Sequence, residues 1–396
     1  MFWGEIAMII SRSESCFLFD DKGEQYIDLI LGNGTHLLGH GFFADEAKEL
    51  ISNGTLCTLT SSNEVELTTK LQSIFGMDKS VKFCNTGSEA TMRAVRAVRA
   101  YTGKKKILMF SGSWHGGNES LLWEEDWSKD REYVIDVPVK PKSAGILDSE
   151  VIMVPYNNPS VFELIISMQS DLAGVIIEPI QGSNPREDMG YFLRTLREVV
   201  RDVPLIFDEL ITGFRVGLKG VQGLYDIEAD IVTYGKVIGG GFPIGVVMGK
   251  SEILDNPDLF YGGTFSGNPI SCGMGNVVLD YLISNESFYD KLYDDSELIF
   301  DAMERELDGY PVQIMKCHSM FRFVFTDRKI KERRDRVDWE DWDMFLRFRD
   351  VMRTNGILVN TNGVCFLCPD HKKYEDRILS KLKSVVKGGF LNYGKK

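Results

Sequence analysis

Between residues 82 and 250, short apolar runs alternate with stretches of helical periodicity, and this alternation restricts the possible folds more than any other feature. The clearest runs are residues 107–110, 151–154, 174–177, 205–207 and 244–248. Apolar runs of this length predict buried strands, and the stretches between several of them are long enough for helices. Such alternation is typical of a parallel sheet covered on both faces. We therefore expect an α/β fold that binds ligands at the carboxyl ends of its strands.

The segments on either side of this region have a more mixed pattern. Residues 1–35 alternate between strand-like runs and turn signals, as in a small β-meander. After Gly273 the sequence predicts one long helix near 270–307, then a mixed segment with two strands and a terminal helix. We expect residues 1–40 and 286–396 to form a smaller α+β domain, and residues 41–285 to form the large domain.

The charge balance excludes one class of function. The 396 residues carry a formal net charge of −13, whereas a surface that binds nucleic acid needs clustered lysines and arginines. The most basic stretch, residues 328–336, is interrupted by acids and predicts a solvated helix face or loop. We expect no nucleic-acid partner.

Cysteine usage and hydropathy suggest a compartment. Seven cysteines, an odd number without regular spacing, do not form a disulfide framework. The first residues lack the pattern of a secretory signal, and no window approaches 18 uninterrupted apolar residues. We expect a cytoplasmic protein that is not embedded in a membrane.

Lys236 is the most informative single residue. It follows the apolar pair Ile231 and Val232 and precedes glycines at 239–241. Apolar surroundings lower the pKa of an amine and make it a usable nucleophile, and glycines leave room beside it for a flat ligand. The alternative is an ordinary lysine at a strand end before a glycine turn.

The start of a predicted helix near residue 87 is a candidate phosphate site. Thr86, Gly87 and Ser88 combine a hydroxyl with free N–H groups at the positive end of the helix dipole. Plain N-capping by Thr86 or Ser88 is the alternative. The buried face of this helix is predicted to contain Ala90, Ala94, Ala97, Val98 and Tyr101.

Further candidate residues follow other predicted strands. Trp114 and His115 lie in a glycine-rich turn, where an aromatic ring can stack on a flat cofactor or simply pack. Glu178 and Asp208 each come directly after an apolar run, where a carboxylate needs a cation or a donor. Asp208 is suited to holding a proton on a pyridinium nitrogen, and helix capping is the alternative for both acids. Residues 261–270 add a second loop of hydroxyls and glycines around Thr264.

Four motifs in this order resemble the class III, fold-type I pyridoxal-phosphate aminotransferases, and most closely the glutamate-1-semialdehyde 2,1-aminomutase subgroup. The motifs are residues 85–92, 208–215, 235–245 and 263–269, and the similarity extends over most of the chain. The resemblance implies a fold-type I transferase, a homodimer, and pyridoxal 5'-phosphate as cofactor.

The resemblance also implies a role for individual residues. Lys236 would bind the cofactor as a Schiff base, and Asp208 would pair with the pyridine nitrogen. Gly87 and Ser88 would bind the phosphate, and Thr264 would reach the phosphate of the neighbouring subunit. Leu210 and Trp114 would cover the two faces of the ring. We count His115 and Glu178 among the candidate cofactor-binding residues as well.

The implied reaction moves an amino group from a small amine or amino-acid donor to a carbonyl acceptor. The alternative within the family is an intramolecular aminomutase of the glutamate-1-semialdehyde 2,1-aminomutase type. Aminomutases carry an N-terminal Ser-Pro-Val-Arg motif that holds the substrate carboxylate, and the nearest arginine here, Arg12, does not match it. We therefore favour intermolecular transamination. A cofactor-binding scaffold without catalysis is a third possibility, which the pairing of Lys236 with Asp208 disfavours.

Two other signals are interpreted as structural. Cys365, Cys368 and His371 fall short of the four ligands of a structural zinc site, so we expect no metal. His36, His40 and His318 stand alone in the sequence and are predicted to be structural, although the first two flank a glycine-rich loop that could border the active site.

Overall fold

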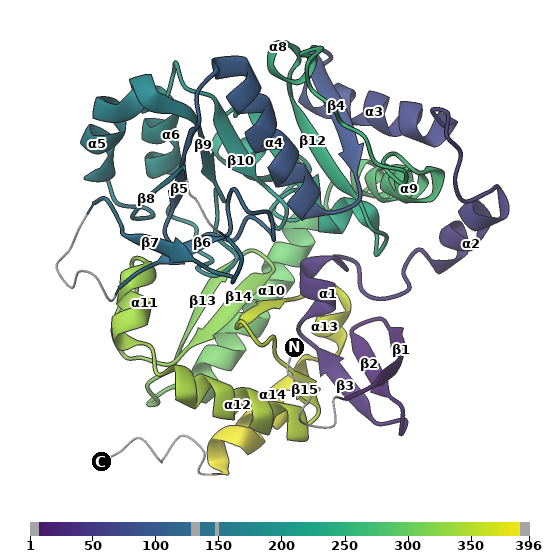
Figure 1. Ribbon diagram of the computed structural model, residues 1–396. Helices are drawn as coiled ribbons and strands as arrows, with labels where there is room; N and C mark the ends of the chain where they lie inside the picture. The colour runs from purple at the N-terminus through teal and green to yellow at the C-terminus, as the bar shows by residue number, and fades with distance from the viewer. Residues whose placement is uncertain (1–7, 128–134, 147–149, 389–396) are drawn as a thin grey trace. The chain divides into compact units, whose positions relative to one another are not determined.

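The computed structural model describes residues 8–127, 135–146 and 150–388, and these divide into two compact units (Figure 1). The small unit comprises the described parts of Met1–Ala44, Ser287–Lys329 and Trp339–Lys396. The large unit comprises the described parts of Asp45–Glu286 and Ile330–Asp338. Residues 330–338, which the sequence assigned to the C-terminal part of the small domain, therefore cluster with the large unit.

A seven-stranded sheet forms the centre of the large unit, with strand order β4-β12-β11-β10-β9-β5-β8. Only β12 runs antiparallel to its neighbours, which confirms the mostly parallel sheet expected from the apolar runs. The strands are β4 Lys79–Cys84, β5 Lys106–Phe110, β8 Val151–Val154, β9 Leu172–Ile177, β10 Leu205–Asp208, β11 Ile231–Gly235 and β12 Gly245–Lys250. A separate ribbon pairs β6 Trp123–Glu125 with β7 Val139–Pro141.

Helix α4 Gly87–Thr102 lies across one face of this sheet (Figure 1). Its buried side chains share a core with strand residues that include Ile231 and Val247. The predicted buried face is correct except for Tyr101, which is exposed in the last turn just before Gly103 ends the helix. Further helical elements of this unit are α2 Ala44–Ser52, which begins at the boundary, α3 Ser62–Phe75, α5 Val161–Met168, η1 Gln169–Asp171, α6 Gly190–Val199, α7 Gly220–Tyr225, η2 Lys236–Gly239, α8 Ser251–Leu254 and α9 Pro269–Ser284.

The long helix predicted near 270–307 is in fact two helices. Helix α9 ends at Ser284, and α10 Phe288–Leu307 begins after a short polar break that includes Asn285. Because short polar side chains compete for backbone hydrogen bonds, the break falls where the sequence loses its apolar residues.

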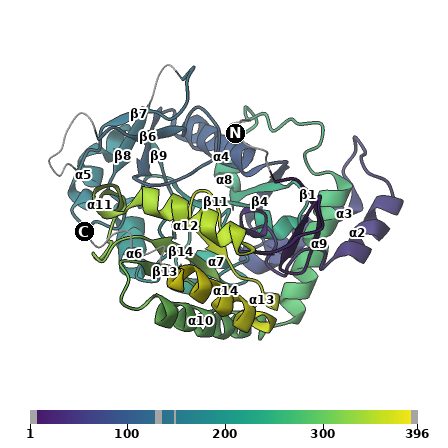
Figure 2. The same cartoon turned by 90° about the horizontal axis from the view of Figure 1, so that it is seen from below.

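The small unit contains two sheets and several helices. Its sheets have the strand orders β1-β2-β3-β15 and β13-β14-β16. Helices α10 and α14 pack side by side in this unit (Figure 2). The remaining elements are β1 Ile10–Glu14, β2 Phe17–Asp20, β3 Gln25–Asp28, α1 Leu31–Gly34, β13 Gln313–Cys317, β14 Met320–Val324, α12 Trp342–Thr354, β15 Ile357–Leu358, β16 Val364–Phe366, α13 Asp370–Lys373 and α14 Glu375–Lys387.

The basic stretch 328–336 and the apolar character of the helices can be compared with what the sequence predicts. The basic stretch runs into the short helix α11 Arg333–Trp339 at its end. There Arg336 is buried rather than solvated, and its guanidinium donates to the Ser183 carbonyl at 2.6 Å. Within the described residues, no helix has the length and apolar character needed to cross a membrane.

Candidate active site

The strand register brings several predicted site residues to one edge of the central sheet. Ile177 on β9 pairs with Phe207 on β10, and Asp208 pairs with Thr233 on β11. Strand β12 begins at this edge because Gly245 pairs with both Gly235 on β11 and Cys84 on β4. The chain therefore leaves β4, β9, β10 and β11 on the same side. Parallel sheets bind ligands at this edge.

Lys236 is the first residue after β11. Its backbone is left-handed, with a φ of 49°, and starts the short 3-10 helix η2. Burial lowers the pKa of its ammonium group, and the nearby carboxylates of Asp208 and Glu178 act in the opposite direction. A lysine with a depressed pKa has a larger fraction of neutral amine, which is the nucleophilic form.

Asp208 ends β10 and forms a buried pair with His115. The Nδ1 atom of His115 lies 2.6 Å from the Asp208 Oδ2 atom, and both side chains are almost fully buried. The other carboxylate oxygen of Asp208 accepts hydrogen bonds from the Thr233 hydroxyl and the Leu210 amide, each at 3.2 Å. Helix capping is excluded for Asp208, because the described chain contains no helix between β10 and α7.

The Nε2 atom of His115 is buried and has no hydrogen-bond partner within the described chain. Burying a polar atom without a partner is costly, so such an atom points to a missing ligand or water. Because the opposite ring nitrogen is held by Asp208, the imidazole has a fixed orientation.

Glu178 organises the loop that carries Trp114. Its carboxylate accepts hydrogen bonds from the Trp114 amide at 2.7 Å and from the Gly182 amide at 3.3 Å. Burial raises the pKa of Glu178 to about 7, although His115 lowers it. Glu178 therefore holds loop backbone rather than capping a helix. The Trp114 ring is half exposed, and the Lys142 ammonium lies 5.1 Å from its centre.

The start of α4 combines capping with free donors. Thr86 is the N-cap and forms a capping box with Glu89, so the capping interpretation is correct for its hydroxyl. The amides of Gly87 and Ser88 have no acceptor among the described residues. The Ser88 hydroxyl accepts from the Gly117 amide at 3.0 Å. A helix N-terminus with free amides is a suitable anion site.

Leu210 packs against two glycines at the sheet edge. A Cβ atom at Gly87 would lie 2.5 Å from one Leu210 methyl, and a Cβ at Gly235 would lie 2.8 Å from the other. A side chain at either position would force Leu210 to move. Leu210 therefore lies between the helix start and the residue before Lys236.

Thr264 is exposed in a loop that Arg93 holds in place. Arg93 is buried in α4 and donates to the Gly262 carbonyl at 3.0 Å and to the Ser266 hydroxyl at 3.2 Å. Within the described chain, no hydrogen bond or ion pair links Thr264 to the other predicted site residues. Its predicted role involves a second subunit.

Several residues that support the site were not identified from the sequence. Glu125 accepts from the Ser111 hydroxyl and the Gly112 amide, each at 2.6 Å. Gln181 donates to the Ser111 carbonyl at 2.9 Å. Both hold the glycine-rich turn before Trp114. Glu125 lies in an acidic stretch between two tryptophans and is buried. The available signal was this run of acids between Trp123 and Trp127.

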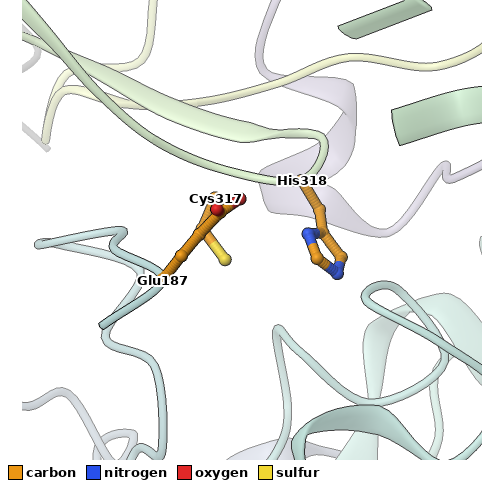
Figure 3. Close-up of side chains that lie close together, drawn as sticks. All are labelled: Glu187, Cys317 and His318. Carbon is orange, nitrogen blue, oxygen red and sulfur yellow. The ribbon is translucent and has the colours of Figure 1, made fainter. Parts of the chain in front are cut away.

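The histidines and cysteines of the small unit lie away from these residues in sequence and pack locally. The His40 Nε2 atom is 2.8 Å from the Asp28 carboxylate, and both are buried. Cys317 and His318 lie at the turn between β13 and β14 (Figure 3), where the His318 ring meets the Tyr293 ring edge to face at 5.0 Å. Glu187, also labelled in Figure 3, belongs to the large unit.

The residues at the sheet edge fit the pyridoxal phosphate that the sequence resemblance implies. The helix start offers free amides for a phosphate, and Asp208 offers a carboxylate for a pyridinium. The unpaired Nε2 atom of His115 adds a polar contact. Lys236 supplies an amine whose pKa burial has lowered.

Comparisons with known proteins agree with this geometry. The model of the family described as aminotransferase class-III matches residues 3–383. A glutamate-1-semialdehyde 2,1-aminomutase from Caldicellulosiruptor bescii is 35% identical over 372 residues, which cover 89% of this chain and 83% of that protein. An omega-transaminase from Sphaerobacter thermophilus has a TM-score of 0.85 at 23% identity, covering 97% of this chain and 92% of that one.

A second solved structure, a transaminase with PLP bound, has a TM-score of 0.84 at 24% identity and covers 98% of this chain and 93% of that chain. These structural matches confirm the predicted fold class, an α/β fold of the fold-type I transferases.

Proposed function

This chain belongs to the class-III aminotransferase family, and on that premise we propose that it transfers an amino group between two separate small molecules, with Lys236 as the catalytic lysine. Enzymes of this family depend on pyridoxal phosphate. The observation that carries the proposal is the lysine with a lowered pKa beside Asp208 at the carboxyl edge of the sheet.

Bound pyridoxal phosphate supplies an electrophilic carbon and an electron sink. Lys236 contributes an amine that burial keeps available in its neutral form. When it is free, its Nζ atom would remove a proton from the amine-bearing carbon of the substrate as a base and would then give a proton back as an acid. The left-handed backbone at Lys236 directs the chain away from β11 at this point.

Asp208 is proposed to hold the proton on the pyridine nitrogen. A buried carboxylate that pairs with a cationic ring nitrogen is well stabilised, and its contacts with Thr233 and Leu210 fix its orientation. His115 is proposed as a positioning residue that orients Asp208 from the opposite side through its Nδ1 atom.

The remaining predicted residues bind rather than react. Gly87 and Ser88 are proposed to bind the phosphate through their free amides. Leu210 and Trp114 are proposed to cover the two ring faces, and Glu178 holds the Trp114 loop through its amide. Thr264 is proposed to complete the phosphate site of a neighbouring subunit in a homodimer.

The choice of intermolecular transfer rests on the lack of a match to the Ser-Pro-Val-Arg motif of the aminomutases, for which Arg12 is the nearest candidate. Arg12 forms an exposed ion pair with Glu14 on β1 and lies over the Phe19 ring of β2 at 3.8 Å. The alternative is intramolecular transfer, which is favoured by the 35% identity to a glutamate-1-semialdehyde 2,1-aminomutase.

A donor screen on the enzyme loaded with pyridoxal phosphate tests the proposal. The panel contains glutamate, alanine, diamines and amino sugars, and separately glutamate 1-semialdehyde with no second substrate. We expect a common donor to bleach the visible absorbance and an amine to appear on a separate acceptor. Turnover of the semialdehyde alone would establish the aminomutase instead.

A further inference from the structure

Glu209 follows Asp208 directly and is completely buried. Its carboxylate accepts three hydrogen bonds from residues further along the chain. The Thr212 hydroxyl donates at 2.9 Å and the Val221 amide at 2.7 Å to one oxygen, and the Gln222 amide donates at 3.3 Å to the other. This carboxylate therefore ties the chain at the end of β10 to the first turn of α7.

The backbone of Glu209 is held as well. Its amide donates to the Thr233 carbonyl of β11 at 3.1 Å, and its carbonyl accepts from the Gly213 amide at 2.8 Å. A Cβ atom at Gly213 would lie 2.6 Å from this carbonyl oxygen and 2.5 Å from the Tyr234 ring, so a side chain there would force the turn to move. Residue 209 is thus held at its amide, its carbonyl and its carboxylate.

The two neighbours of Glu209 in the chain are residues that we propose to contact the cofactor. Asp208 would pair with the pyridine nitrogen, and Leu210 would cover one face of the ring. Because the three residues are consecutive, a shift of the Glu209 backbone would move Asp208 and Leu210 with it. Small displacements of groups that orient a reactant are costly for binding and reaction.

Keeping a carboxylate at this position is costly. Burial raises the pKa of Glu209 to about 7, although its three hydrogen-bond donors lower it. Acids with a shifted pKa beside the reacting groups of an enzyme are candidates for a functional role, although buried acids also stabilise folds. The alternative is that Glu209 only stabilises the contact between β10 and α7.

Gly220 makes room for the Glu209 carboxylate. It has a φ of 59°, and a Cβ atom there would overlap with this carboxylate, whose Oε2 is the nearest atom. A substitution at residue 220 would therefore displace the carboxylate without changing Glu209 itself. Gly103 is the matched position, because its φ of 68° is similar and a Cβ atom there meets nothing within 4 Å.

We propose that Glu209 is a positioning residue for the amine transfer, and that it holds Asp208 and Leu210 where pyridoxal phosphate binds. The inference rests on the proposed function, because it takes these two residues as contacts of the cofactor. Glu209 acts through the loop that its carboxylate closes, and it touches neither cofactor nor substrate.

Cofactor titration and urea unfolding of the same variants test this role. We expect Glu209→Ala to weaken binding of pyridoxal phosphate to the apoenzyme by a factor on the order of 10 or more, because it leaves three donors without their acceptor. Glu209→Gln, which keeps one acceptor oxygen, should recover part of that affinity. Gly220→Ala should weaken binding with Glu209 intact, and it decides the matter if Glu209→Ala does not fold.

Asp230→Asn is the matched control for a buried carboxylate. Asp230 is also buried and accepts from the Leu205 amide at 2.7 Å and from Arg197 at 2.6 Å, but it precedes β11, at the opposite end of this strand from Lys236. We expect Asp230→Asn to lower the urea midpoint and to keep the cofactor affinity within about twofold of wild type. Gly103→Ala should likewise lose stability and keep the affinity.

The visible circular dichroism of the bound cofactor separates positioning from stability. We expect its intensity per bound cofactor to change in Glu209→Ala and Gly220→Ala and to stay at the wild-type level in both controls. If affinity and dichroism change no more in these variants than in the controls, the proposal is overturned and Glu209 serves the fold alone. Failure of the wild-type protein to bind pyridoxal phosphate would overturn the proposed function too, so the two failures are distinguishable.

Discussion

The Nδ1 atom of His115 lies 2.6 Å from the Oδ2 atom of Asp208, and the two residues are 93 positions apart in the sequence. Each side chain is almost completely buried, so the pair is shielded from solvent. The carboxylate that we propose as the partner of the cofactor nitrogen is thus itself held by an imidazole.

Replacing His115 with Phe is expected to weaken binding of pyridoxal phosphate by a factor on the order of 10 to 100, because a hydrogen bond to a charged group contributes about 1.5–3 kcal/mol. Fluorescence titration of the apoenzyme measures the effect. His115→Asn, which keeps a polar side chain, should recover part of the affinity. Equal affinity in wild type and His115→Phe would contradict the positioning role.

Gly116→Ala is expected to disturb the phosphate site. Gly116 has a φ of 85°, and a Cβ atom there would approach the Ser88 Cα atom to 2.8 Å. We expect this variant to lose about 1–3 kcal/mol of stability and to bind pyridoxal phosphate more weakly. Gly117→Ala is the matched control, because a Cβ there meets nothing within 4 Å and its amide still donates to Ser88. If both variants unfold at the same temperature and bind pyridoxal phosphate with the same affinity, the close approach of residue 116 to Ser88 does not limit the phosphate site.

The stability of the protein is expected to fall between pH 4.5 and 7 in part because of Glu178. Its pKa rises from 4.5 to about 7 on burial, so in this range the folded protein binds a proton that the unfolded chain releases. The free energy of unfolding therefore decreases as the pH rises, by roughly 3 kcal/mol from this group.

Urea unfolding at several pH values measures that slope. Glu178→Gln, which mimics the neutral form, should flatten it, whereas the exposed Glu163→Gln should leave it unchanged. An unaltered slope in Glu178→Gln would show that burial of this carboxyl does not control the pH dependence.

Arg93→Ala is expected to loosen the loop around Thr264. The guanidinium holds the Gly262 carbonyl and the Ser266 hydroxyl, and removing it takes away both of these bonds to the loop. If Thr264 completes a neighbouring subunit's site, the variant should dissociate at higher protein concentration than wild type in analytical ultracentrifugation. Arg96→Ala, which loses one exposed hydrogen bond to the Phe260 carbonyl, is the control. If Arg93→Ala and Arg96→Ala dissociate at the same protein concentration, Arg93 does not hold the loop that supports the dimer.

The sequence predicts the fold well where local patterns determine structure. Five of the apolar runs form strands of the central sheet, and α4 begins at Gly87, where the sequence predicts the start of a helix. The errors have local causes. Tyr101 follows the helical periodicity but lies in the last turn of α4, and the break at Asn285 divides a pattern that reads as one helix.

The contacts of the site are harder to predict from the sequence, because they join residues that are far apart along the chain. The identity of Glu178 as a carboxylate after a strand is visible in the sequence, but its bond to the Trp114 amide depends on how two loops meet. The contact of Leu210 with Gly87 and Gly235 likewise arises from tertiary packing. Motifs identify the residue types, and the register of β9, β10 and β11 determines which of them meet.

The most direct test of the central claim is the visible absorption spectrum of the purified protein loaded with pyridoxal phosphate. If Lys236 is the lysine that binds the cofactor covalently, Lys236→Ala should lose the visible band of the lysine-bound cofactor, and an added small amine should restore a similar band. The exposed Lys105→Ala should keep the wild-type spectrum. An unchanged band in Lys236→Ala, resistant to added amine, would contradict the assignment of Lys236.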